Sequence, residues 1–211
     1  MNDNETPDYL EKKGREIIEA LEQHMSKFAD IPSNFLRNSS KDSDWMSLIK
    51  WHALLETCLN QLLSAHFKTP ELNRIIARLE MSNTKTGKIA FATACGLLTP
   101  DMRAFIQKLS EMRNYAVHDI KNFNFTFSSY AESIDTNDRR AWGRVMAFAE
   151  GDTHQRDAAI EKSIRDVVHF GFTWILLQVC LHDMSFQQGQ PPVLLQNPKS
   201  TPKKPRQNSQ S

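Results

Sequence analysis

Two long stretches of this sequence repeat apolar residues at the spacing of an α-helix, and this pattern constrains the fold most strongly. One runs from Trp45 to Phe67 and the other from about Arg156 to Met184. Apolar residues that recur every three or four positions lie on one face of a helix. The first stretch is apolar over more than half of the helical circumference, so we expect it to be the central helix of an all-α fold.

Helix-start signals divide the rest of the chain. Thr69-Pro70-Glu71-Leu72 and Thr99-Pro100-Asp101-Met102 each place a capping hydroxyl before a proline and an acidic residue in the first turn. Proline suits that position because its missing N–H has no partner there, and the acid complements the positive end of the helix. Ser43 or Asp44 can cap the central helix. Further helices are predicted over residues 7–29, 87–98 with an end at Gly96, and 136–150.

The remaining segments lack helical periodicity. Residues 36–42 form a polar break, and residues 122–127 alternate polar and aromatic side chains, which predicts a short strand or an extended loop. Residues 187–211 are rich in Pro, Gln, Ser and Lys and are predicted to be disordered. We therefore expect a compact bundle of about six helices in one domain, residues 1–186, with a core at about 43–184 and a disordered tail.

The charge of the chain argues against nucleic-acid binding by its whole surface. The formal net charge is +1, and the four basic residues of the tail are the only charges after Asp183. Without those four, the remainder carries a net charge of about −3. Any contact with RNA therefore has to be local.

Cysteine usage and hydropathy indicate the compartment. Cys58, Cys95 and Cys180 lie in apolar helical runs without a CxxC pair, which favours reduced, buried thiols and no metal site. Residues 1–9 are acidic and polar, unlike a signal peptide, and the most apolar run, residues 170–181, is too short to span a bilayer. We expect a soluble, cytoplasmic protein that contacts no membrane and uses no cofactor.

The sharpest candidate site is the segment Arg113-Asn114-Tyr115-Ala116-Val117-His118, in the last turns of the helix that begins at Thr99. Five residues along a regular α-helix amount to a rotation of about 140° beyond one full turn. The side chains of Arg113 and His118 therefore share a face only if the helix ends irregularly. If the helix is regular, the two residues can act together only in a site that is shared with a second chain. Asp119 and Lys121 add polar groups close by, and Tyr115 can anchor the segment.

Arginine and histidine together suit metal-independent cleavage of RNA. That reaction needs a base to take the proton from a ribose hydroxyl and a cation to hold the phosphate as negative charge builds. Histidine titrates near neutral pH, and the planar guanidinium of arginine binds phosphate through several donors. A structural alternative is that Arg113 pairs with Glu111 or Asp119 while His118 caps the helix end. The other histidines, including His52, form no pair at metal-ligand spacing and are expected to be surface or core residues.

The pattern Arg113-Asn114-xxx-His118 resembles the Arg-x(4–6)-His motif of the HEPN superfamily, in which a polar residue typically follows the arginine. A long helix that contains His52 and Glu56 precedes the motif, in the order that is typical of this family. The segment from Lys85 to Ile89 and much of the chain onward to Phe127 are similar to mannitol operon repressor-like members. The similarity covers roughly residues 43–130.

The resemblance implies a helical bundle that forms a homodimer and brings two Arg/His pairs into one cleft. Many members are endoribonucleases of toxin–antitoxin, phage-defence or RNA-processing systems and use no metal. Carried over to this sequence, Arg113 would stabilise phosphate charge, His118 would be the general base or acid, and Asn114 would orient the phosphate or His118. Tyr115, Asp119 and Lys121 would support the site. Glu56 matches an acidic position of the family, although a buried or capping carboxylate accounts for it equally well.

Other members of the family are noncatalytic, which leaves a second hypothesis. The chain could be a mannitol operon repressor-like transcriptional regulator or an interaction module, in which the motif is structural or contacts an antitoxin or another regulatory protein. The absence of a basic bias in residues 1–184 favours this alternative.

Overall fold

All elements are helical in the computed structural model, which describes residues 7–39, 41–147, 160 and 162–190. This confirms the all-α prediction, with more short helices than expected. In chain order, the α-helices are α1 (Pro7–Ala29), α2 (Phe35–Ser39), α3 (Asp44–Phe67), α4 (Asn73–Arg78), α5 (Lys88–Ala94), α6 (Pro100–His118), α7 (Phe127–Ser133), α8 (Thr136–Met146) and α10 (Ile164–Gln187). Two 3₁₀ helices, η1 (Pro70–Leu72) and η2 (Ile120–Asn124), lie before α4 and after α6.

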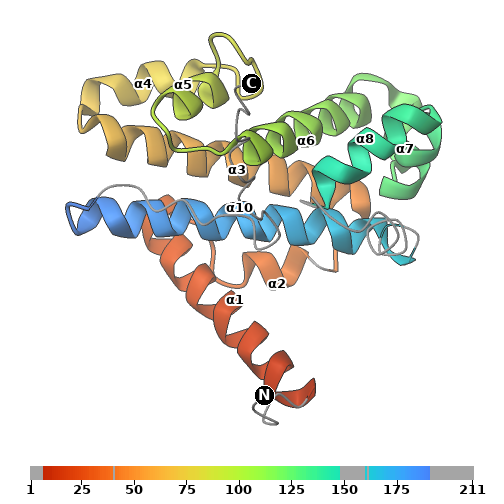
Figure 1. Cartoon of the computed structure of the whole chain (residues 1–211), viewed down its shortest axis with the longest axis horizontal. Helices are drawn as coiled ribbons and strands as arrows, with labels where there is room; N and C mark the ends of the chain where they lie inside the picture. Colours follow the sequence, from red (N-terminus) through yellow and green to blue (C-terminus); the bar gives the residue numbers. More distant parts are fainter. Residues whose placement is uncertain (1–6, 40, 148–159, 161, 191–211) are drawn as a thin grey trace, which may run out of the picture.

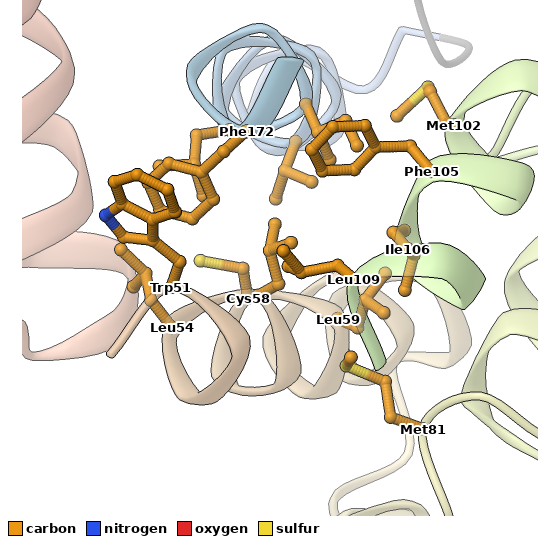
Figure 2. Packing of buried hydrophobic residues seen from close by; sticks show 14 of the residues in the cluster. Trp51, Leu54, Cys58, Leu59, Met81, Met102, Phe105, Ile106, Leu109 and Phe172 are labelled. Carbon is orange, nitrogen blue, oxygen red and sulfur yellow. The ribbon is translucent and has the colours of Figure 1, made fainter. Parts of the chain in front are cut away.

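Helix α3 is central, as its sequence predicts. It packs against α10, α6, α1, α4 and α5, and Figure 1 shows α3 and α10 side by side, with α4, α5 and α6 on one side of the pair and α1 and α2 on the other. The core fills the space between α3, α6 and α10 (Figure 2). Trp51, Leu55 and Leu59 of α3 are fully buried there, together with Phe105 of α6 and Phe172 of α10.

The longest helices begin where the sequence places them. Ser43 caps α3, because its side chain accepts a hydrogen bond from the N–H of Met46 at 3.3 Å. Thr99 caps α6 by accepting from the N–H of Met102 at 3.2 Å, with proline at the first helical position. Helix α1 has the predicted bounds, and α5 is followed by Gly96 in the left-handed region, at φ 70°.

The prediction of an α-helix that starts at Thr69 is wrong for its first turn. The Thr69 hydroxyl donates to the carbonyl of Phe67 at 2.9 Å and is thus turned back towards the end of α3. Lys68, at φ 51°, ends α3 in the left-handed conformation and turns the chain there. The residues after Thr69 form the 3₁₀ helix η1, and the α-helix begins only at Asn73.

Two short helices replace segments that were predicted to be irregular. The polar break contains α2, and residues 122–127 form neither a strand nor an extended loop but the end of η2 and the start of α7. A capping box explains α7, since Thr126 and Ser129 exchange hydrogen bonds between side chain and backbone. The last helix begins at Ile164. The predicted helical residues 148–150 and 156–159, and the tail from residue 191, lie outside the described residues.

Helix α10 combines apolar composition with a position in the core. By length and composition α10 could cross a membrane. The sequence pattern indicates only the shorter apolar run of residues 170–181, which is too short to span a bilayer. Its apolar side chains Val168, Phe172, Ile175 and Val179 are nevertheless buried against the other helices. Helix α10 is therefore part of the core of the bundle.

The cysteines are free, and two of them are buried as expected. Cys58 and Cys180 lie in the core, whereas Cys95 is half-buried. Burial, with a contribution from the nearby charge of Asp183, raises the pKa of the Cys180 thiol to about 12. Burial also raises the pKa of the Cys58 thiol, so both core thiols are protonated at neutral pH.

Gly171 of α10 leaves room for the ring of Phe105 on α6 and for the end of α8. A Cβ at Gly171 would lie 2.5 Å from Cε2 of Phe105 and 3.0 Å from the carbonyl oxygen of Met146. We expect Gly171→Ala to lower the free energy of unfolding by about 1–3 kcal/mol through overpacking. Gly14→Ala on α1 is the control: nothing lies within 4 Å of that position, so it should stabilise by up to about 1 kcal/mol. Urea denaturation measures the stability of both variants, and equal effects would contradict the close packing at Gly171.

Candidate functional site

Helix α6 presents the predicted motif at the edge of the core. Its buried face docks on α3 and is formed by Met102, Phe105, Ile106, Leu109, Met112 and Ala116. Arg113 follows the fully buried Met112 and lies half-buried at the border of this face. Asn114 and His118 point to solvent with the exposed side chains of Tyr115 and Val117. The motif therefore lies on the accessible end of a helix whose other side is fixed in the core.

The helix continues without interruption to His118. The first residue beyond it, Asp119, has an extended backbone at φ −125° and ψ 124°. The irregular helix end that would turn Arg113 and His118 towards one side is thus not formed. In a regular helix the two side chains leave the axis about 140° apart. One chain alone does not bring this pair together.

The carboxylates closest to Arg113 in the sequence bind other groups. Nη1 of Arg113 donates to the Oδ1 atom of the neighbouring Asn114 at 3.1 Å. Glu111 pairs with Lys108 at 2.7 Å, and Asp119 accepts from the backbone N–H of Lys121 at 2.9 Å. Among the described residues, Arg113 has no ion pair, so the structural alternative of a pair with Glu111 or Asp119 does not describe its surroundings.

The supporting residues hold the chain that follows the motif. The Tyr115 ring contacts those of Tyr130 and Phe125, with centroids 5.2 Å and 6.5 Å away, and its carbonyl accepts from Nδ2 of Asn122 at 2.7 Å. These contacts fold η2 and α7 against the end of α6. The backbone of Lys121 is held by Asp119, while its side chain is exposed. Tyr115 therefore connects the end of α6 to the residues that follow it.

Glu56 lies on α3 and pairs with a buried lysine. Its Oε1 atom is 2.5 Å from Nζ of Lys88, whose side chain is 0% exposed, whereas that of Glu56 is 38% exposed. Nζ also lies 3.4 Å from the carbonyl of Ala77. Gly87 allows the preceding loop to close over this lysine, because a Cβ there would lie 2.4 Å from the carbonyl oxygen of Glu80. Glu56 thus compensates a buried charge, which agrees with the structural account of it.

His52 is a site residue that the sequence did not single out. It lies half-buried one helical turn before Glu56, and this spacing places both side chains on one face of α3. Burial lowers the pKa of His52, and the positive charge of Arg113 lowers it further. The only sequence signal was the His-xxx-Glu spacing, which cannot reveal that Arg113 lies nearby.

A cavity of about 320 Å³ lies elsewhere, between α1, α2 and α10. Leu36 and His169 contribute to its wall, and none of the residues that line it belongs to the motif or its supporting set. Within the ranges that the structure describes, no three His, Cys, Asp or Glu side chains come together in a way that could hold a metal ion.

No protein-family model, curated protein or solved structure matches this chain. The fold and the site together define an all-helical bundle with a half-buried arginine and an exposed histidine at one helix end.

The Glu56–Lys88 pair gives an asymmetric prediction. Glu56→Gln leaves the ammonium of Lys88 buried without a counter-charge, so we expect the free energy of unfolding to fall by about 2–4 kcal/mol. Lys88→Met removes the buried charge and leaves a carboxylate that water can reach, so its cost should stay below about 1.5 kcal/mol. Urea denaturation of the two variants tests this order, and a larger loss for Lys88→Met would contradict it.

Proposed function

We propose that this chain is a cytoplasmic RNA-binding protein of the HEPN type, which forms a homodimer and cleaves RNA without a metal ion. One observation carries the proposal. Arg113 and His118 leave one regular helix in different directions, at an accessible helix end that is surrounded by exposed apolar side chains. A second copy at this end would cover the apolar surface and supply the missing histidine to each arginine.

The state of Arg113 supports a phosphate ligand. Its guanidinium is engaged by a neutral amide and lies at the border of the core, where water screens charge less than at a free surface. Several of its donors can bind phosphate oxygens in a bidentate manner. Lys121 adds a positive charge at the same helix end, so the local attraction to RNA does not depend on the net charge of the chain.

The exposed apolar side chains support a second copy as the partner. Ile120 is 87% exposed and Phe123 is 69% exposed on η2, next to Tyr115 and Val117 at 40% and 38%. Apolar surface that is gathered in this way typically marks an interface. In a twofold dimer the same surface is used by both subunits, which would place both motifs at one interface.

RNA cleavage in the presence of a chelator tests the proposed function. The wild type should cleave single-stranded RNA, and His118→Ala should lower the rate by roughly 100-fold to 10,000-fold because a proton-transfer group is lost. Arg113→Ala should cost roughly 100-fold or more, and Arg113→Lys should recover little because lysine lacks the planar donor fork. His66→Ala, on α3 away from the motif, is the control and should cleave like wild type. No cleavage by any protein, or equal cleavage by all, removes the claim.

Mixing the two inactive variants tests whether the site is shared. In a mixed dimer, the Arg113 of the His118→Ala subunit meets the His118 of the Arg113→Ala subunit, so one complete pair is restored. We expect the mixture to regain a measurable fraction of wild-type cleavage after subunit exchange. An inactive mixture that contains mixed dimers would place both residues of the active pair in one chain.

A charge in the apolar surface should separate the dimer. Phe123→Asp should weaken self-association by roughly 30-fold or more, or about 2 kcal/mol, and lower cleavage in proportion. Phe170→Asp is a matched control, since Phe170 is 59% exposed on α10 and lies outside the proposed interface. Sedimentation at several protein concentrations measures both variants. Unchanged association of Phe123→Asp would place the interface elsewhere.

A noncatalytic regulator of the mannitol operon repressor-like kind is the second candidate. The separation of Arg113 and His118 on the helix favours it if the chain stays monomeric, because the pair then cannot act together. In that case the apolar side chains of η2 would bind a regulatory protein instead of a second copy. An inactive wild type that copurifies with a protein partner, and loses that partner on Phe123→Asp, would support this candidate.

A further inference from the structure

Within one chain, the histidine beside Arg113 is His52. Nε1 of Trp45, at the start of α3, donates to the carbonyl of Ala116, near the end of α6, at 3.3 Å. The two helices run in opposite directions (Figure 1), so the path from Trp45 to His52 along α3 leads back from Ala116 to Arg113 along α6. Seven residues on α3 and three on α6 each return to nearly the same helix face. Seven residues rise about 10.5 Å along α3 and three residues rise about 4.5 Å along α6, so the two residues are offset by about 6 Å along the helices. Helical side chains lean towards the N-terminus of their own helix, so Arg113 and His52 extend towards each other across this offset, and the two interact electrostatically.

Four charged groups surround the His52 imidazole. They are Arg113 from α6, Glu56 from α3 itself, Lys88 from α5 and Glu80 from the loop before α5. The carboxylate of Glu56, which would favour a protonated imidazole, is engaged by the ammonium of Lys88. Burial and the charge of Arg113 outweigh the two carboxylates and keep the pKa of His52 below its ordinary value. The imidazole is therefore neutral at neutral pH, and a neutral imidazole can accept a proton.

We propose that His52 is the proton acceptor of the RNA cleavage proposed above, and that His118 of the second copy is the proton donor. This inference rests on the proposed function. The 2′-hydroxyl oxygen bonds to phosphorus while its proton passes to His52, and the phosphorus–5′-oxygen bond breaks. His118, in its protonated form, gives a proton to the departing 5′-oxygen. The products are a 2′,3′-cyclic phosphate and a free 5′-hydroxyl, and Arg113 holds the phosphate throughout.

The pH dependence of cleavage by the full-length protein tests this role. We expect the wild-type cleavage rate to rise with pH over the range in which His52 loses its proton; this is the rising limb of the rate profile. His52→Asn and His52→Gln should lack the rising limb and should cleave RNA roughly 100-fold or more slowly than wild type. RNA binding by these variants should stay within a few-fold of wild type. His66→Gln is the matched control on the same helix, about 21 Å along its axis from His52, and should keep the wild-type profile.

An NMR titration supplies a readout that does not depend on the variants being active. The pKa of His52 in the wild type should coincide with the rising limb of the rate profile, and Arg113→Gln should raise it by removing a positive charge. This inference alone would be overturned by folded His52 variants that cleave within a few-fold of wild type and keep the rising limb of the rate profile. It would also be overturned if the rising limb of the wild type did not follow the titration of His52. Absence of wild-type cleavage would overturn the proposed function and this role with it.

Discussion

The burial of α3 is the constraint on which the rest of the structure depends. This helix contacts α10, α6, α1, α4 and α5, and Leu48, Trp51, Leu55, Leu59 and Leu62 are fully buried along it. Helix α6 covers one of its sides with a continuous apolar face. A rotation of α6 by one residue would expose Met112 and bury Arg113 without a counter-charge, and both changes cost free energy. The core therefore fixes where the guanidinium reaches the surface.

A polar cluster at the start of α3 sets the position of the segments around the motif. Oδ1 of Asp44 pairs with Arg165 of α10 at 2.7 Å, and Oδ2 accepts from the backbone N–H of Phe127 at 3.0 Å. Arg165 also donates to the hydroxyl of Ser47 at 2.8 Å. One carboxylate thus joins α3, α7 and α10 through partly buried, charge-assisted hydrogen bonds, which are stronger than those between neutral groups. Because η2 lies between α6 and α7, this cluster also determines where η2 lies.

The sequence predicts the long helices well because their determinants are local. A capping hydroxyl, a proline and an apolar stripe act within a few residues, as at Ser43 and Thr99. The prediction is wrong where a side chain has two possible partners, as at Thr69, or where a helix is too short for periodicity, as in α7. The apolar stripe of α6 also places Arg113 at the surface. The proximity of His52 to Arg113 could not be predicted, because it depends on a helix register that contacts between distant parts of the chain determine.

The end of α6 combines two features that a stable monomer does not need. Exposed apolar side chains on η2 gain nothing from contact with water, and the half-buried guanidinium of Arg113 has no carboxylate partner among the described residues. Each would be accounted for by the same event, since a second chain can cover Phe123 while an anion binds Arg113. The packing of the core requires neither the apolar residues on η2 nor an unpaired Arg113. The core would be equally well packed if η2 carried polar residues and a glutamate lay near Arg113. The apolar residues on η2 and Arg113 are the residues that the proposed dimer and the proposed RNA site would explain.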